Sequence, residues 1–249
     1  MGKCVVVLSA RPNFERLEKV RTDVDKKFPV ISVSPTIPTW FSEIPDIEYF
    51  QDDYFLERDI LQKTNLPRKK WYYQQFLKYE IILRLIKFSQ VHIIDGDSIL
   101  DKKLYFDHNS RYTPIKINPA YNCYLKNLGI NPRKTNFITN EMSFKRTELL
   151  EMLAELDCTR DNYIEQLSKS INEDCWFSEY QIYAIFKIEN KRSEATKIKV
   201  FRRYDLIPKW MIKNLERRYS LIAFETHHSK TLSRKLRAVW LYLLNRNLG

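Results

Sequence analysis

The first hundred residues alternate between short apolar runs and longer amphipathic segments, and this alternation limits the possible folds more than any other feature. The runs at 3–9, 30–33 and 91–94 are rich in Val and Ile, and 47–50 is a further candidate strand. Residues 13–27 and 68–88 carry apolar side chains three and four positions apart, which is typical of one face of a helix. Strands that alternate with helices predict an α/β fold with a mostly parallel sheet.

The rest of the chain carries weaker signals. Short strands are predicted at 116–118, 136–139, 197–201 and 219–224, and helices at 143–156, 162–172 and 178–188. A last helix, at 231–247, places Leu and Val side chains on one face and basic residues around it. We therefore expect one main domain over residues 1–228 and a basic amphipathic C-terminal helix over residues 229–249.

Composition excludes several classes of protein. The chain has 249 residues, 44% of them hydrophobic, so it can bury a proper core. With 4 Gly residues and neither G-x-G-x-x-G nor G-x-x-x-x-G-K-[ST], it lacks the usual dinucleotide and P-loop motifs. No apolar run approaches the ~18 residues that a membrane span needs. The 4 cysteines are scattered without a C-x-x-C pair, so we expect reduced thiols and a soluble, cytoplasmic protein.

Net charge is concentrated at one end of the chain. Residues 197–249 contain 13 Lys and Arg against 3 Asp and Glu, whereas residues 1–196 contain 29 against 28. A strongly basic end indicates contact with a polyanion. An anionic membrane surface fits the amphipathic helix at 229–249, with its apolar face in the headgroup region. The alternatives are a helix that packs on the main domain and a solvated face that binds nothing.

The sequence Asp95-Gly96-Asp97 directly follows the apolar run 91–94. Ligands of open α/β sheets bind beyond the carboxyl ends of the strands, so both carboxylates are expected at a binding edge. Mg²⁺ and Mn²⁺ favour such oxygen ligands and are commonly shared with substrate phosphates. Gly96 lets the chain turn between the two aspartates. The alternative is a D-x-D sequence that has arisen by chance in a loop.

Three blocks resemble a group of short bacterial glycosyltransferase-like proteins with the GT-A fold. The segment 70–78, K-W-Y-Y-Q-Q-F-L-K, contains a W-x-x-Q-Q-x-x-K helix and is followed by the D-x-D strand at 91–97. The segment 177–183, F-S-E-Y-Q-I-Y, is similar to an F-S-E-Y-E-x-Y block, and 137–144 lies where members carry an H-x-M-F-like stretch. The resemblance covers roughly residues 70–185 and implies a GT-A-like mixed sheet flanked by helices.

The resemblance also implies a nucleotide-diphosphate-sugar donor at the strand ends and Mn²⁺ or Mg²⁺ as cofactor. Asp95 and Asp97 are the expected metal ligands, and Asp95 also contacts the donor. Because negative charge grows on a departing diphosphate, nearby positive charge assists the transfer. Gln75 and Lys78 share one helix face and are expected to bind the donor. The structural alternative is that the glutamine satisfies buried backbone groups.

Glu179, in the third block, is the candidate for acting on the acceptor. A carboxylate near the reacting carbon can take the proton of an acceptor hydroxyl, which makes Glu179 the expected catalytic base. It could equally bind acceptor hydroxyls without proton transfer, or stabilise the start of a helix behind Ser178. The sequence departs from the family pattern at Gln181, where a second Glu is usual, and at Asn140, where His is frequent. These departures leave the acceptor's identity open.

Three further residues are candidates by position. Arg11 follows the first strand and is expected to contact the base or phosphate of the donor. His227 and His228 follow a predicted strand, and several metal-dependent GT-A enzymes close their metal site with a C-terminal His. We therefore expect one of the pair to join Asp95 and Asp97 at the metal, and a surface turn is the alternative.

Together these patterns predict a glycosyltransferase that moves a sugar from a nucleotide-diphosphate donor to a growing bacterial surface glycan, such as capsule or lipopolysaccharide. The expected partners are the nucleotide sugar, a glycan or lipid-linked acceptor and an anionic membrane surface at the inner face of the cell membrane. A nucleic-acid-binding protein is the second hypothesis, and it accounts for the basic end but not for the three blocks. A metal-dependent nuclease or phosphatase would need more acidic or His ligands.

Overall fold

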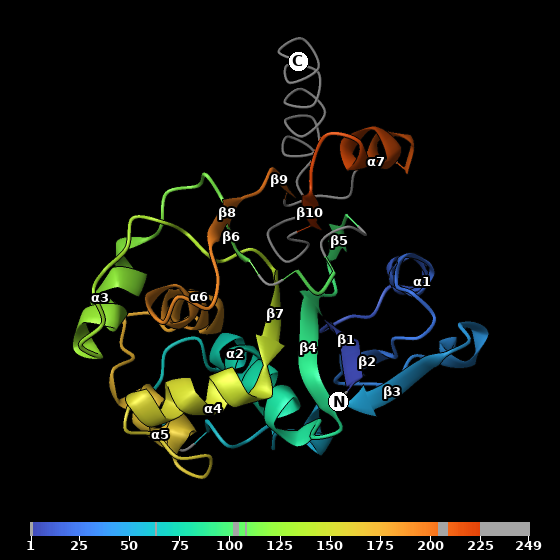
Figure 1. Cartoon of the computed structure of the whole chain (residues 1–249). Helices are drawn as coiled ribbons and strands as arrows, with labels where there is room; N and C mark the ends of the chain where they lie inside the picture. The colour runs from blue at the N-terminus through green and yellow to red at the C-terminus, as the bar shows by residue number, and fades with distance from the viewer. Residues whose placement is uncertain (1, 63, 102–104, 108, 204–208, 225–249) are drawn as a thin grey trace.

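A computed structural model describes residues 2–62, 64–101, 105–107, 109–203 and 209–224. Its central feature is a five-stranded sheet with the order β3-β2-β1-β4-β7 (Figure 1). The first four strands are parallel, and β7 runs antiparallel to β4. The predicted α/β fold with a mixed, mostly parallel sheet is therefore confirmed. The strands are β1 (Gly2–Leu8), β2 (Val30–Ser34), β3 (Ile47–Gln51), β4 (Phe88–Asp95) and β7 (Glu141–Lys145).

Both faces of the sheet are covered, as β1 shows. Cys4, Val6 and Leu8 belong to one hydrophobic core, and Val5 and Val7 belong to the core on the opposite face. Successive side chains of a strand point to opposite faces, so a continuous apolar run needs cover on both sides. Figure 1 shows α2, α4, α5 and α6 on one side of the sheet and α1 on the other. The helices are α1 (Phe14–Asp23), α2 (Lys69–Arg84), α4 (Arg146–Glu155), α5 (Tyr163–Lys169) and α6 (Glu179–Glu189).

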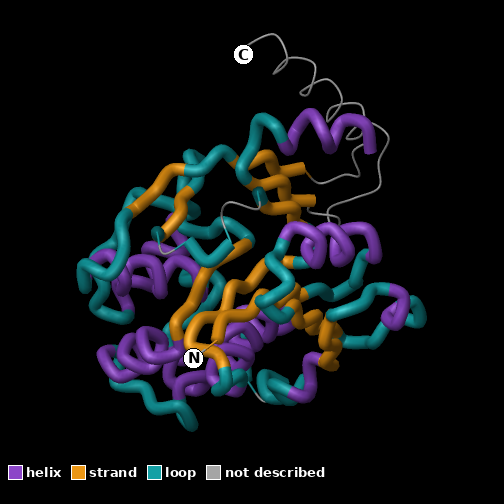
Figure 2. The backbone as a smooth tube through the Cα atoms, turned by 45° about the vertical axis from the view of Figure 1, so that its right-hand side comes forward, coloured by secondary structure: helices purple, strands orange, loops and turns teal. Residues whose placement is uncertain are grey.

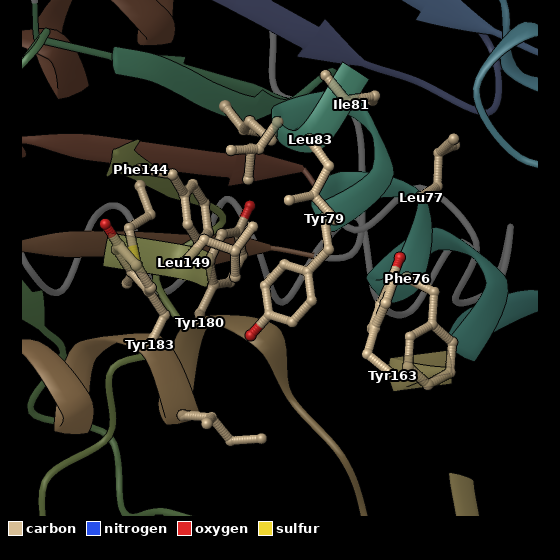
Figure 3. Close-up of a cluster of buried hydrophobic side chains, with 14 of the residues drawn as sticks. Phe76, Leu77, Tyr79, Ile81, Leu83, Phe144, Leu149, Tyr163, Tyr180 and Tyr183 are labelled. Carbon is tan, nitrogen blue, oxygen red and sulfur yellow. The ribbon is translucent and has the colours of Figure 1, made fainter. Parts of the chain in front are cut away.

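Helix α2 is buried over most of its length, because it lies between the sheet and the helices that cover it. Aromatic rings fill the space around it (Figure 3). The Phe76 ring stacks on Phe177 with centroids 4.8 Å apart. The Tyr79 hydroxyl is also buried, and it donates to the backbone oxygen of Glu179 at 3.1 Å. Ring packing and a satisfied hydroxyl thus fix α2 against the start of α6.

Two smaller sheets lie beyond the carboxyl ends of the parallel strands (Figures 1 and 2). One has the order β5-β10-β9, and the other pairs β6 with β8. They position the segment after Asp97, because β5 begins at Ser98. The remaining elements are β5 (Ser98–Leu100), β6 (Ser110–Tyr112), α3 (Pro119–Asn127), β8 (Ala195–Lys197), β9 (Val200–Arg203), α7 (Lys209–Glu216), β10 (Leu221–Phe224) and the 3-10 turns η1 (Phe41–Glu43) and η2 (Asp52–Tyr54).

Several predicted boundaries are wrong, because tertiary pairing overrides local periodicity. The helix predicted over 68–88 ends at Arg84, and Phe88 begins β4 instead, where it pairs with Gly2. The helix predicted over 143–156 begins only at Arg146. Its first residues belong to β7, in which Ser143 pairs with His92 of β4. Side chains that suit one helix face also suit a buried strand, and pairing with β4 decides between them.

Other predictions fall on loops or outside the described residues. The segments 116–118 and 136–139 form no strand, although Asn136 makes an isolated bridge with Thr113. Helix α3 follows 116–118 instead, with Pro119 in its first turn and the Asn118 side chain capping it. The single strand predicted over 197–201 is wrong, because the segment is divided between the end of β8 and the start of β9, which belong to different sheets. The strand predicted over 219–224 is confirmed with a later start, at Leu221. The helix predicted over 231–247 lies outside the described residues, and among the described helices none could cross a bilayer.

The expectation of reduced thiols is wrong for two of the cysteines. Cys123 of α3 and Cys175, in the loop before α6, form a disulfide with 5.0 Å between their Cα atoms. The two residues are 52 positions apart, so the sequence spacing gave no sign of this contact. Cys4 and Cys158 are free and buried. The disulfide ties α3 to the segment that leads into α6.

The burial of Lys187 in α6 should make folding stability depend on pH. Its side chain is 4% exposed, and burial lowers its pKa from 10.5 to about 8. The unfolded chain therefore binds more protons than the folded chain between pH 8 and 10.5, so this residue makes stability rise with pH, by at most about 1.4 kcal/mol per pH unit. We expect Lys187→Met to remove that rise in urea unfolding measured across this range.

The matched control is Lys126→Met, which removes an exposed lysine from α3. It should leave the pH profile of the unfolding free energy unchanged. If the unfolding free energy of Lys187→Met changed with pH in parallel with that of the wild type, Lys187 would not be the source of the pH dependence.

Candidate active site

The candidate site lies where β1 and β4 end side by side. Leu8 and Asp95 are partners in the sheet, and the backbone N–H of Gly96 donates to the Leu8 oxygen at 2.7 Å. A Cβ atom added at Gly96 would lie 2.4 Å from the Cβ of Ser9. The segment after β1 and the segment after β4 therefore approach too closely for any residue other than glycine to fit at position 96 without a shift.

Asp95 presents its carboxylate at this edge. Its backbone N–H donates to the oxygen of Asn140 at 2.8 Å, which ties the end of β4 to the start of β7. Its side chain is 27% exposed, and its Oδ1 lies 2.8 Å from the Nζ of Lys78. The Tyr180 hydroxyl donates to the same oxygen at 3.3 Å. Asp95 thus faces solvent on one side and a buried cation on the other.

Lys78 is the centre of the cluster, and its side chain is 3% exposed. Its Nζ lies 2.6 Å from Oε1 of Glu179, in addition to its contact with Asp95, and 4.1 Å from the centre of the Tyr180 ring. Burial alone would lower the pKa of Lys78, but the charges of Asp95 and Glu179 outweigh burial, and the pKa lies well above its usual value. The ammonium is therefore charged between two carboxylates.

Glu179 is fully buried at the start of α6. Burial raises its pKa above the usual range, although the Lys78 ammonium opposes the shift. The Gln75 amide faces the same carboxylate, and the orientation that satisfies both groups places its nitrogen as the donor. The structure thus brings Gln75, Lys78, Asp95 and Glu179 together. A base role for Glu179 would require an acceptor hydroxyl to reach a side chain that has no exposed surface here.

Asp97 interacts electrostatically with Arg16, a residue that the sequence motifs did not single out. Burial lowers the pKa of Arg16, and the negative charge of Asp97 opposes that lowering. Arg16 belongs to the first turn of α1, where a positive charge is unfavourable to the helix dipole. That misplaced charge is the one sequence signal that could have drawn attention to it. Tyr180 was also missed as a site residue, because its place in the third block does not show that it contacts Asp95.

Arg11, predicted to contact the donor, is less closely joined to the charged cluster. Arg11 is exposed, and within the described residues no hydrogen bond or ion pair joins its side chain to Asp95 or Asp97. Its position three residues beyond Leu8 still places it at the same edge of the sheet. His227 and His228 lie outside the described residues.

The two aspartates fit a metal that is shared with a substrate. In the described ranges no group of three or more His, Cys, Asp and Glu side chains gathers around one point. Mg²⁺ and Mn²⁺ nevertheless bind through one or two carboxylates together with substrate phosphates. Asp95 and Asp97, one residue apart at an open edge, have the oxygen ligands for such a site.

Comparison with known proteins identifies the fold. No protein-family model matches the sequence, and neither does any curated protein. The galactosyltransferase LgtC, solved in complex with donor and acceptor sugar analogs, aligns with a TM-score of 0.51 and 8% identity, over 88% of this chain and 86% of LgtC. This likeness confirms the expected GT-A-like fold.

Two further solved structures show weaker likeness. Mouse xyloside xylosyltransferase 1 in its apo form aligns with a TM-score of 0.48 and 8% identity, over 92% of this chain and 99% of that protein. The Streptococcus pneumoniae glycosyltransferase GlyE aligns with a TM-score of 0.40 and 11% identity, over 97% of this chain and 60% of that protein.

The contact between Gly96 and Ser9 predicts a pairwise effect on stability. We expect Gly96→Ala to lower the free energy of unfolding by about 1–3 kcal/mol, because the new Cβ overlaps that of Ser9. Adding Ser9→Gly removes the overlapping atom and should restore part of the loss. Urea unfolding of both variants measures the effect.

The matched control adds Ser9→Ala to Gly96→Ala. It keeps the Ser9 Cβ at 2.4 Å and removes only the Oγ at 2.8 Å, so it should restore less than Ser9→Gly. A Gly96→Ala variant as stable as the wild type would contradict this prediction, because it would show that the segments of Ser9 and Gly96 can move apart with no loss of folding free energy.

Proposed function

We propose that this protein is a metal-assisted glycosyltransferase that moves a sugar from a nucleotide-diphosphate donor to a glycan or lipid-linked acceptor. One observation carries the proposal: at the carboxyl edge of a GT-A-like sheet, a buried Lys78 lies between Asp95 and Glu179. A charged, fixed ammonium beside an open carboxylate suits a ligand that combines a diphosphate with a metal ion.

The donor's diphosphate would lie at the edge formed by Asp95 and Asp97. Mn²⁺ or Mg²⁺, held by these aspartates and by His227 or His228, would supply Lewis-acid neutralisation of the departing diphosphate. Lys78 adds a permanent positive charge next to Asp95, and Arg11 at the same edge is the proposed contact for the donor's base or phosphate.

Glu179 and Gln75 would act on the donor through Lys78. Because Glu179 holds the ammonium at 2.6 Å, Lys78 keeps one anionic partner even when Asp95 binds another ligand. The Gln75 amide in turn fixes the Glu179 carboxylate. The assignment of Glu179 as the catalytic base stays a prediction, which substitution can separate from this positioning role.

The proposed donor sugar and acceptor rest on the resemblance of the sequence to bacterial glycosyltransferase-like proteins. We propose a hexosyl donor and a bacterial surface glycan, such as capsule or lipopolysaccharide, as the acceptor. The basic segment 229–249 would hold the protein at anionic lipid on the inner face of the cell membrane. Binding of nucleic acid without catalysis is the competing function.

Glu179→Gln distinguishes a positioning role from a base. If Glu179 positions Lys78, the variant should bind the donor nucleotide with Mn²⁺ about tenfold more weakly without acceptor present, a loss of about 1.4 kcal/mol. Lys78→Met should weaken that binding further, because the charge itself is removed. Isothermal titration measures both affinities.

Glu165→Gln, at an exposed position in α5, is the control and should bind the nucleotide normally. Unchanged nucleotide affinity in Glu179→Gln, together with lost transfer, would support the base instead.

Asp97→Ala tests the metal site. Wild-type protein with Mn²⁺ and a panel of nucleoside diphosphates should be stabilised by about 2.7 kcal/mol at a ligand concentration of 100 Kd, and thermal unfolding measures this. We expect the stabilisation to disappear in Asp97→Ala and after chelation of the metal. Asp161→Ala, at an exposed position outside the site, should respond like the wild type.

If no nucleotide stabilises the wild type while DNA binds in a salt-dependent manner, the transferase proposal is wrong and the nucleic-acid-binding function replaces it.

A further inference from the structure

Three partly exposed aromatic rings gather at the N-terminal end of α2, and we call them the aromatic cluster: Trp71, Tyr121 and Trp176. The Trp71 and Tyr121 rings lie 6.5 Å apart, and those of Tyr121 and Trp176 lie 5.8 Å apart. The guanidinium carbon of Arg68 lies 4.7 Å from the centre of Trp71 and 4.9 Å from that of Trp176. Three separate segments of the chain therefore supply one small surface of aromatic rings around a cation.

The cluster is held in place by covalent and backbone contacts. The disulfide between Cys123 and Cys175 ties the helix of Tyr121 to the residue before Trp176. The Trp176 backbone N–H donates to the oxygen of Ala120 at 2.9 Å. Its indole N–H donates to the oxygen of Glu173 at 2.8 Å, so the polar atom of that ring is satisfied. What Trp176 offers to a ligand is therefore its apolar ring surface.

Arg68 has an unusual backbone and an unpaired side chain. Its φ of 53° and ψ of 41° lie in the left-handed region, which favours glycine and costs an arginine free energy. Its side chain is exposed, and among the described residues no carboxylate forms an ion pair with it. The guanidinium carbon lies within 5 Å of both indole centres, and a guanidinium that no carboxylate pairs with can donate to a pair of oxygens of a ligand.

The aromatic cluster adjoins the candidate active site. Trp71, Gln75 and Lys78 are spaced by four and three residues, so they share one face of α2. The seven residues from Trp71 to Lys78 span about 10 Å along the helix axis. In the loop that leads into α6, Trp176 precedes the buried Glu179 by three residues. One extended ligand could therefore contact the cluster and reach the edge at Asp95.

We propose that the aromatic cluster and Arg68 form a subsite for the acceptor glycan. The C–H faces of a pyranose ring carry slight positive charge and pack on the negative faces of aromatic rings. A pair of oxygens on that sugar, either vicinal hydroxyls or a carboxylate, accepts from the Arg68 edge. The inference rests on the proposed function and adds where the acceptor binds.

The test measures binding of oligosaccharides without donor, by isothermal titration. The probes are a neutral cellulose-derived hexasaccharide and an oligogalacturonate of similar length, which separate hydroxyl from carboxylate recognition. We expect the wild type to bind at least one probe, and Trp176→Ala to bind it at least tenfold more weakly. Tyr54→Ala, which removes an exposed ring away from the cluster, is the matched control and should bind like the wild type.

Arg68→Gly separates loss of recognition from loss of folding. Glycine suits the left-handed backbone, and this gain offsets the lost contacts with the indoles, so the Tm should stay close to that of the wild type while oligosaccharide affinity falls at least tenfold. Stabilisation by Mn²⁺ with a nucleoside diphosphate should be unchanged in both cluster variants, because the donor binds elsewhere.

Three results would overturn the subsite: no binding of either probe by the wild type, equal affinity in the cluster variants, or lost nucleotide binding in Trp176→Ala, which would assign the rings to the donor's base. Failure of the proposed function would give a different result: no nucleotide would stabilise the wild-type protein against thermal unfolding.

Discussion

A buried ammonium joins three parts of the chain that are remote in sequence. Lys78 of α2 contacts Asp95 at the end of β4 and Glu179 at the start of α6. Removing these charges from water costs several kcal/mol per ion, and close, well-aligned contacts are needed to offset that cost. The three elements therefore cannot separate without leaving a buried charge unpaired. The stacking of Phe76 on Phe177 also ties α2 to the segment that leads into α6.

The edge of the sheet carries charges of both signs before any ligand binds. Asp95 and the buried Glu179 flank Lys78, and the charge of Asp97 acts on that of Arg16. A bare phosphate would meet two carboxylates at this edge, and a bare metal ion would meet two cations. A metal-bound diphosphate carries both signs of charge and can exchange partners with groups of either sign. On the proposed function, this arrangement selects for the complex of donor and metal over either alone.

Local pattern was enough to predict the parts of the structure that depend on neighbouring residues. The apolar runs identified β1 and β4, and helical spacing placed Gln75 and Lys78 on one face of α2. Contacts that depend on distant pairing were missed. Residues 143–145 became a strand because β4 pairs with them, and Cys123 meets Cys175 across 52 positions. Arg16 and Tyr180 join the site for the same reason: their partners come from other elements, and no periodicity within one element reports such a contact.

Helix α2 connects the proposed acceptor subsite with the proposed donor site. Its N-terminal end carries Trp71, beside Arg68 in a strained backbone conformation, and its middle carries Lys78 in the charged cluster. Because the helix is packed on nearly all sides, the spacing between these residues is rigid. A substrate that contacts both must therefore match the length of the helix segment between them. The disulfide beside Trp176 reinforces the same constraint from the opposite side, since it fixes the loop that leads directly into Glu179.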